Sequence, residues 1–413
     1  MIIDNERVAR YYSLFIFLFF IRKLERLWNS NYVKLWTANF LLYFAFMLLM
    51  PLLPIYLNDT FGANKQVIGI VLSGYTLTAL LVRPFSGFVI DTLPRKKVLL
   101  VCYFLFFVIF AGYFAAGSLL LFAVVRTLHG APFGATTVAN STVAIDVLPS
   151  SRRAEGIGYY GLSNNIATAI GPTAAIYLYN AYHNFDLIFL LSLVSAGIGF
   201  VVDATVKTAP RTPVAEKRAI SLDRFFLLKG WSQSISVICL AFSYGILSTY
   251  VAIYGKEELG ITGGTGAFFA LFAIGLMLSR TFGSQLLRRG RVVQNVSIGV
   301  LISLCGYALF AAVQSPVAYY ITPFVIGIGN GLMFPAFQTM FINLAENCQR
   351  GTANSTMFTS WDLGVGAGVL LGGMAAEQAG YHLAFWIAVA VNALGIAFFF
   401  AYAKRRFLQD KLR

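Results

Sequence analysis

Three ionisable residues stand inside long apolar stretches, where proton chemistry would need them. Asp362 is an acid well inside one stretch, and Arg126 and His129 are about one helical turn apart in another. A charged side chain at the bilayer centre costs ~2.5–3.5 kcal/mol on insertion scales, so such residues usually have a function. Dry surroundings favour a protonated carboxylic acid, a nearby cation favours the carboxylate, and histidine titrates near neutral pH. We therefore predict that Asp362, Arg126 and His129 carry out proton coupling, with Asp362 facing Arg126.

Each of these residues also has a structural interpretation. Asp362 could bond a neighbouring helix near one membrane surface, and His129 could be a satisfied hydrogen-bond donor. Arg126 lies some eight residues into its stretch, which is deep for a side chain that reaches water by snorkelling. Arg83 and Arg280 have similar places in two other stretches, and for them both snorkelling and a gating contact stay open.

Amide side chains are a second set of candidates, because an amide in lipid needs hydrogen-bond partners and favours the interior of a helix bundle. Asn165 aligns with Asp362 in an internal repeat, which would put a polar pair across a central cavity. Some of these side chains could instead only join helices. The predicted wall of the substrate cavity comprises Asn39, Asn164, Asn165, Asn330, Gln338 and Trp361.

The stretches that carry these residues have the length of membrane-spanning helices. The chain has 413 residues, of which 58% are apolar and 12% are charged, whereas soluble domains carry roughly 25% charged residues. Apolar runs of about eighteen or more residues match a hydrocarbon core of ~30 Å. The sequence therefore predicts an all-α membrane protein with twelve transmembrane helices. Their expected ranges are 34–57, 66–91, 98–116, 118–147, 157–180, 185–206, 230–254, 263–287, 292–313, 317–344, 353–379 and 381–403.

The second half of the chain repeats the first. A shift of 197 residues aligns Arg83 with Arg280, Phe85 with Phe282, Gly130 with Gly327, Gly134 with Gly331, Arg153 with Arg350, Ser163 with Ser360 and Gly171 with Gly368. A parallel duplication of six-helix halves puts a solute site near the midplane, where the halves meet. The predicted division is a cytoplasmic or interfacial segment 1–33, a first half 34–206, a linker 207–229, a second half 230–403 and a cytoplasmic tail 404–413.

The net charge of +14 is a topology signal. Of the 31 lysines and arginines, 26 lie in the termini and in the loops of one side. The positive-inside rule puts that side, and both termini, in the cytoplasm. The chain is thus expected in a plasma or inner membrane, in contact with the lipid bilayer, and nucleic acid is not expected as a partner.

A loop after the second apolar stretch resembles a known family signature. Residues 87–97 read Gly-Phe-Val-Ile-Asp-Thr-Leu-Pro-Arg-Lys-Lys, similar to the G-x-x-x-D-R-x-G-R-[RK] loop of the major facilitator superfamily, with Thr92 and Pro94 as departures. Residues 146–156 resemble the family's second cytoplasmic signature. The resemblance implies the major facilitator fold, and a latch in which Asp91 meets the loop's cations and the helix that begins near Thr352.

The implied latch closes the cytoplasmic side in an outward-facing state. An acid at a helix C-terminus is disfavoured by the helix dipole, so Asp91 needs a partner from elsewhere. The predicted latch residues are Gly87, Asp91, Arg95, Lys96, Asp146, Arg153, Arg83 and Arg280.

Residues 126–134 resemble the R-x-x-x-G-x-x-x-G element of the family's proton-coupled members, and the drug–proton antiporter branch is nearest in appearance. The resemblance implies a secondary transporter that exports an amphipathic or drug-like solute by alternating access in exchange for protons. A transporter of a polar metabolite such as a sugar, and a receptor that binds without moving solute, stay open as alternatives.

Enzymatic chemistry has no basis in the sequence. The chain contains no Walker A loop, no H-E-x-x-H and no C-x-x-C motif, so neither ATP hydrolysis nor metalloenzyme chemistry is indicated. The expected partners are a small-molecule solute, protons and lipid. No cofactor or metal is expected, and the protein is expected to be monomeric.

Overall fold

The computed structural model describes residues 26–63, 65–208, 222–261 and 265–412, and every regular element in these ranges is helical. The predicted segment 1–33 and linker 207–229 therefore lie mostly outside the described residues. The first half contains α2 Ser30–Leu49, α3 Leu53–Phe61, α4 Lys65–Thr92, α5 Arg95–Ala115, α6 Leu119–Val147, α7 Arg153–Tyr182 and α8 Phe185–Ala204.

The second half contains α9 Trp231–Glu257, α10 Thr265–Arg288, α11 Val292–Ala312, α12 Pro316–Leu344, α13 Arg350–Phe398, a π-helical turn Phe399–Ala403 and α14 Lys404–Asp410. Helix α13 is two helical stretches, because Ala379 and Gly380 leave the helical conformation and Gly380 has a φ of 83°. Glycine adopts such a positive φ without a steric penalty. The break falls where the sequence predicts the boundary between the last two spans.

Ten of the described segments are long and apolar enough to cross a membrane, so the chain is an integral membrane protein. Helix α7 is not among the ten, although it is 30 residues long, and the last segment, 347–410, runs through the break at Gly380. The described helices follow the predicted order closely, but the number of twelve spans stays a prediction.

Serine and asparagine caps fix where several helices begin. The side chains of Asn29, Ser118, Asn184 and Ser315 each accept a hydrogen bond from the backbone N–H three residues later. Such caps satisfy backbone donors that a helix start leaves free. Between α2 and α3 the chain leaves the helical conformation around Pro51, a residue that has no backbone N–H to donate to the preceding turn.

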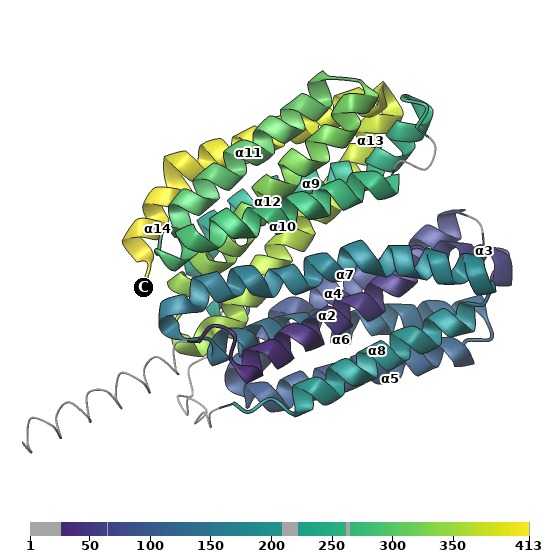
Figure 1. Cartoon of the computed structure of the whole chain (residues 1–413), viewed down its shortest axis with the longest axis horizontal. Helices are drawn as coiled ribbons and strands as arrows, with labels where there is room; N and C mark the ends of the chain where they lie inside the picture. Colours follow the sequence, from purple (N-terminus) through teal and green to yellow (C-terminus); the bar gives the residue numbers. More distant parts are fainter. Residues whose placement is uncertain (1–25, 64, 209–221, 262–264, 413) are drawn as a thin grey trace, which may run out of the picture.

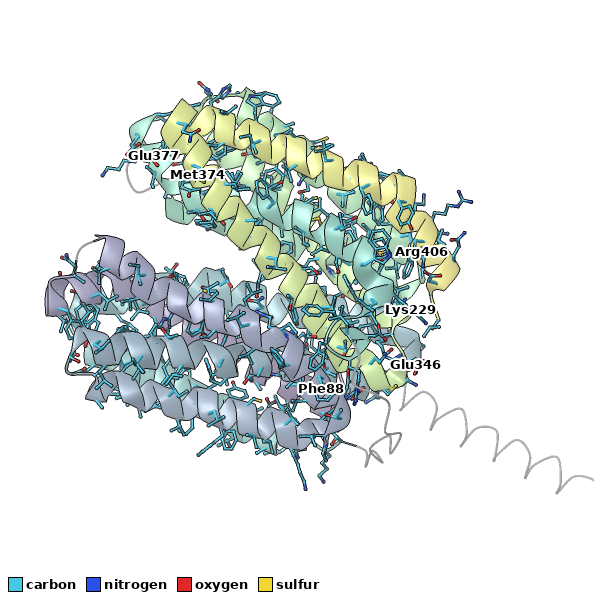
Figure 2. The ribbon with its side chains drawn as sticks, turned by 180° about the vertical axis from the view of Figure 1, so that it is seen from behind. Phe88, Lys229, Glu346, Met374, Glu377 and Arg406 are labelled. Carbon is cyan, nitrogen blue, oxygen red and sulfur yellow. The ribbon has the colours of Figure 1, made fainter. Side chains whose placement is uncertain are left out.

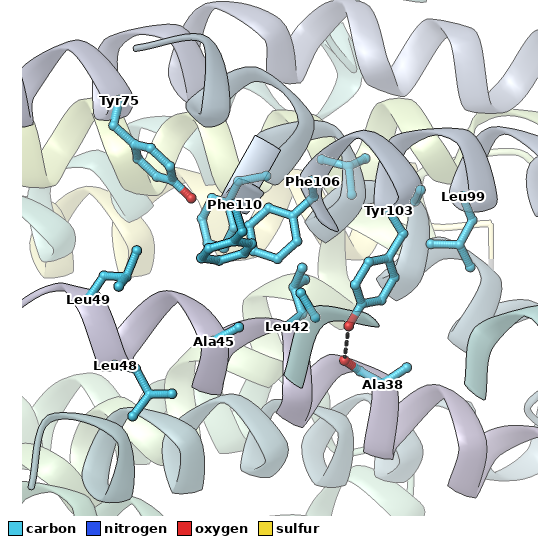
Figure 3. Close-up of a cluster of buried hydrophobic side chains, with 14 of the residues drawn as sticks. Ala38, Leu42, Ala45, Leu48, Leu49, Tyr75, Leu99, Tyr103, Phe106 and Phe110 are labelled. Carbon is cyan, nitrogen blue, oxygen red and sulfur yellow. Dashed lines mark hydrogen bonds between the residues drawn. The ribbon is translucent and has the colours of Figure 1, made fainter. Parts of the chain in front are cut away.

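Close packing of helices holds each half together, and the repeat is visible in the contacts. A Cβ at Gly130 would strike the backbone oxygen of Tyr75, and a Cβ at its counterpart Gly327 would strike that of Phe272. Both halves therefore need glycine at the same crossing. In the first half, Figure 3 shows the buried cluster beside this crossing, where the Tyr103 hydroxyl donates to Ala38 O.

The two halves meet at one end of the molecule and separate toward the other (Figure 1). The joined end lies beside α14, and the separated end carries α3. Contacts between the halves run mainly between α4 and α13 and between α7 and α10. Figure 2 shows the same arrangement from behind, with Phe88 and Glu346 at the joined end and Met374 and Glu377 at the separated end.

Candidate functional site

Asp91 of the first half binds the start of α13 in the second half. Its carboxylate accepts hydrogen bonds from the backbone N–H of Gly351 (2.9 Å) and of Thr352 (2.7 Å), and from the Thr352 hydroxyl (3.0 Å). Arg95 adds an ion pair of 2.7 Å. The positive end of the α13 dipole thus supplies the partner that the C-terminus of α4 cannot give. This is the arrangement that the resemblance implies.

A second acid extends this arrangement across the halves. Asp146 pairs with Arg95 at 2.6 Å and with Arg350 at 2.5 Å. Arg95 also donates to Asn347 O (3.1 Å), so its guanidinium contacts both halves. We call Asp91, Arg95, Asp146 and Arg350 the interhalf network. Several mutually paired charges make a more stable contact than one exposed pair.

Some residues predicted for the latch are not members of the interhalf network. Lys96 donates to the carbonyls of Ala204 (3.0 Å) and Val206, and so caps the end of α8 within the first half. Arg153 donates to Ser150, while its repeat counterpart Arg350 makes the contact with Asp146. The repeat alignment pairs these two arginines, so the sequence contained the signal that identifies Arg350 as a partner of Asp146.

Gly87 lets α4 and α13 approach closely. A Cβ at Gly87 would strike the Ser355 side chain and lie 3.0 Å from Gly351 O, and a Cβ at Gly351 would lie 2.7 Å from Gly87 O. The distance of 2.7 Å is shorter than real Cβ contacts show, and the distance of 3.0 Å is tighter than nine in ten of them. The hydrogen bonds of Asp91 to the start of α13 depend on this approach.

The intramembrane acid pairs with an arginine other than the predicted one. The structure joins Asp362 of α13 to Arg83 Nε of α4 at 2.7 Å, and not to Arg126. The Arg83 guanidinium also lies 5.1 Å from the ring centre of Phe358 and 3.4 Å from the Thr137 hydroxyl. The side chain of Arg83 is 7% exposed and that of Asp362 23%, so the acid is the more accessible member of the pair.

Arg83, Gly87 and Asp91 form one stripe along α4. Residues four and eight apart lie on the same helix face, and eight residues span ~12 Å. Every member of the stripe contacts α13: Arg83 binds Asp362, Gly87 adjoins Gly351, and Asp91 binds the α13 start. The spacing was present in the sequence and indicates why Arg83 faces the opposite half.

Arg126 and His129 lie within the first half. Arg126 donates to the Tyr113 hydroxyl (3.3 Å) and lies 4.1 Å from the ring centre of Tyr75. His129 Nδ1 lies 3.0 Å from the same hydroxyl, and its Nε2 lies 3.0 Å from Phe106 O. Both nitrogens of His129 thus have partners, which matches the structural interpretation of this residue.

Arg280 repeats the position of Arg83, but no acid in the described part of the chain pairs with it. It is buried, donates to Gly331 O (2.8 Å), and lies 3.5 Å from where a Cβ of Gly161 in α7 would be. Asn165, one turn beyond Gly161, stands where the repeat would have Asp362. In the contact between α7 and α10 the arginine is thus kept and the acid is replaced by an amide, whereas the contact between α4 and α13 has both charges.

Several predicted wall residues join helices. Asn39 donates to Ser163 (2.8 Å), and the Ser303 hydroxyl donates to Asn330 (3.2 Å). Asn164, in contrast, accepts from the Thr168 hydroxyl one turn later in the same helix, α7 (3.3 Å). Trp361 lines an apolar pocket, whose other walls are Val237, Leu240, Met333, Phe334, Phe337 and Met357.

One hydrogen-bonded bridge between the halves was not predicted. Gln338 donates to Asn354 (3.0 Å), and Asn354 donates to Thr142 of the first half (3.0 Å). Asn354 is fully buried and lies about one turn into α13. Asn354 follows Gly351 by about one helical turn, and this closeness to the predicted latch was the signal in the sequence that could have identified it. With this bridge, polar contacts join the halves from Asp91 at the joined end to Asp362.

Two helical halves joined by buried polar contacts at one end and separated at the other match the two-repeat arrangement of membrane transport proteins. The comparisons give the family. The family model of the Major Facilitator Superfamily matches residues 35–368 and 296–411. The chain belongs to the Major Facilitator Superfamily.

Curated relatives and solved structures cover nearly the whole chain. The staphylopine export protein of Staphylococcus aureus is 24% identical over 363 residues, which are 85% of this chain and 90% of that protein. The quinolone resistance protein NorA of the same species is 22% identical over 383 residues, 89% of this chain and 95% of NorA. The structure is also similar to that of FucP, the E. coli fucose:proton symporter, in the outward conformation, with a TM-score of 0.76, 16% identity and coverage of 92% of this chain and 99% of FucP.

Proposed function

We propose that the protein is a proton-coupled secondary transporter that exports a small amphipathic solute by alternating access. The observation that carries this proposal is the ion pair between Arg83 and Asp362, because it joins the two halves inside the membrane. Relatives named for staphylopine export and for quinolone resistance support export. The distribution of basic residues puts the joined end in the cytoplasm, so the described state would open to the outside.

The proposed coupling follows from the position of the pair. A proton that reaches Asp362 from the open side neutralises the carboxylate and removes the partner of Arg83. Without that attraction, the α4 stripe holds α13 less firmly, and the joined end can part. Asp362 then carries its proton to the opposite side, where solute entry and the return of Arg83 favour its release. The protein would remain in an inner or plasma membrane with both termini in the cytoplasm.

The test is dye transport in proteoliposomes with an imposed pH gradient. Two fluorescent xanthene dyes serve as amphipathic solutes, carboxyfluorescein as an anion and rhodamine 6G as a cation. We expect a gradient to drive uptake of at least one dye, and Asp362→Asn to abolish the gradient dependence. Arg83→Gln should do the same, because the pair needs both partners. Asp410→Asn, an acid paired with Arg406 in the tail, is the matched control and should transport normally.

Two results would refute the proposal. One is the absence of gradient-driven flux for both dyes and for a wider panel of amphipathic solutes. The other is full proton-driven flux in Asp362→Asn, which would remove this acid from the coupling.

A further inference from the structure

Arg126 is a buried cation without a negatively charged partner among the described residues. It is 1% exposed, and the groups that contact its guanidinium are the Tyr113 hydroxyl, the Met50 sulfur (3.6 Å) and the faces of Tyr75 and Phe46. All of these are neutral. A buried charge usually has an ionic partner, because desolvation without one is strongly unfavourable. Contact with aromatic faces offsets only about 2 kcal/mol of that penalty.

Two hydrogen-bond donors at this place have no acceptor in the described structure. Arg126 Nε is buried and unbonded, and so is the hydroxyl of Tyr75, whose ring lies 4.1 Å from the guanidinium carbon. Tyr75 is only 3% exposed. Buried polar groups normally have partners, so two free donors beside an unpaired cation fit a ligand that brings negative charge and acceptor oxygens. A carboxylate has both, and it matches the planar fork of arginine.

The neighbours of Arg126 hold its guanidinium in place. A backbone carbonyl can only accept, so the bond to Phe106 O assigns a hydrogen to His129 Nε2. In the neutral ring, Nδ1 then accepts from the Tyr113 hydroxyl, whose oxygen remains free to accept from Arg126. This bonding pattern makes His129 and Tyr113 positioning residues for Arg126.

Access to the guanidinium depends on one flexible side chain. Met50 covers Arg126 Nη2 and is itself 44% exposed. It lies directly after α2, before the break at Pro51, and α3, which follows this break, is at the separated end (Figure 1). An unbranched thioether changes rotamer easily, so a ligand can reach the guanidinium by displacing it. The repeat counterpart of Arg126 is Pro323, which means that this cation exists in the first half alone.

We propose that Arg126 binds a carboxylate of the transported solute, whose apolar part lies against Phe46 and Tyr75. This inference rests on the proposed transport function and specifies its substrate class as amphipathic carboxylates. Here Arg126 contacts the solute, while Asp362, the ion-pair partner of Arg83, takes up and releases the proton. The two charged residues thus have separate tasks, in separate places of the molecule.

The test compares 1-naphthoate with 1-naphthamide, which share one ring system and differ in charge. Their affinities for the full-length protein in detergent are measured by isothermal titration calorimetry. We expect naphthoate to bind at least tenfold more tightly, since hydrogen bonds to charged groups contribute about 1.5–3 kcal/mol. Arg126→Gln should remove this preference and leave naphthamide binding unchanged. Arg126→Lys, which keeps the charge, should retain part of it.

Arg280→Gln is the matched control, because Arg280 is also buried and has no acidic partner among the described residues. It should keep the preference for naphthoate. Equal affinities for the two probes in the unsubstituted protein, or a preference that survives Arg126→Gln, would overturn the proposal. So would loss of the preference in Arg280→Gln alone.

Two further measurements separate the possible failures. If Arg126→Gln does not fold, Tyr113→Phe leaves the cation and removes its hydrogen bond, and should weaken naphthoate binding threefold or more without affecting naphthamide. A preference unchanged by Tyr113→Phe would then count against the proposal. Dye flux distinguishes this proposal from the transport function: flux without naphthoate preference refutes the carboxylate site alone, and naphthoate preference without flux refutes the transport function alone.

Discussion

Replacing Asp91 with asparagine should open the joined end of the molecule. The carboxylate accepts four hydrogen bonds, from Arg95, from the N–H groups of Gly351 and Thr352, and from the Thr352 hydroxyl. An asparagine keeps one oxygen, but its amide would turn a donor toward the Thr352 N–H and lose that bond, while the Thr352 hydroxyl could accept from the amide and donate to Arg224 O. The remaining bonds lose their charge assistance. Each hydrogen bond to a charged group contributes about 1.5–3 kcal/mol, and water replaces part of the loss. We therefore expect the free-energy difference between the described state and a state with a parted joined end to shift by ~3 kcal/mol.

A shift of this size changes the conformational equilibrium by roughly 10²-fold. A population that is almost entirely in the described state would then divide about evenly between this state and one in which the joined end has parted. Double electron–electron resonance reports the change as a second, shorter distance between two exposed spin-label sites at the separated end: Thr60 in α3 (Figure 1) and Glu377 (Figure 2). Asp410→Asn should show one distance.

An unchanged distance distribution in Asp91→Asn would refute this reasoning, because it would mean that the interhalf network does not bias the equilibrium. A loss of folded protein is distinguished by the elution volume in size-exclusion chromatography. Arg95→Gln should act in the same direction, since Arg95 pairs with both Asp91 and Asp146.

Three other changes have defined outcomes. Gly87→Val should force α4 from α13, because its Cβ would strike Ser355, and should give the same shorter distance as Asp91→Asn; an unchanged distance would contradict the close approach. Asn165→Asp should supply Arg280 with an ion pair, raise the melting temperature by a few degrees and slow dye flux, and a lower melting temperature would speak against this pairing. A cysteine at Glu257 should react with an impermeant maleimide from outside intact cells and one at Ser150 should not, whereas the reverse pattern would invert the topology.

Local patterns predicted the helices well, and the family signature predicted the contacts of Asp91. Hydrophobic length and the repeat are properties of the chain itself, so the spans and the break near Gly380 follow from them. The partner of Asp362 was missed because it depends on which helix faces meet across the two halves. Burial alone suggested Arg126, while the four-residue spacing of Arg83, Gly87 and Asp91 indicated the correct arginine.

The interior of the first half was harder to predict for a similar reason. His129 was expected to titrate, but two hydrogen-bond partners come to it from α5, a helix whose orientation the sequence does not state. Lys96 belongs to the signature loop, yet its long side chain reaches the carbonyls that end α8. Long basic side chains have many acceptors within reach, and tertiary packing selects among them.

The stripe on α4 also bears on proton leakage. Arg83, Gly87 and Asp91 lie on one helix, so an outward movement of α4 as a unit stretches all three contacts with α13 together. A conformer that frees Arg83 from Asp362 while keeping the far contact intact would need a bend in the helix, and Pro84, directly after Arg83, is where α4 would bend. Mechanical coupling of this kind would suppress a continuous water path between the two compartments, and so limit uncoupled slip of protons down their gradient.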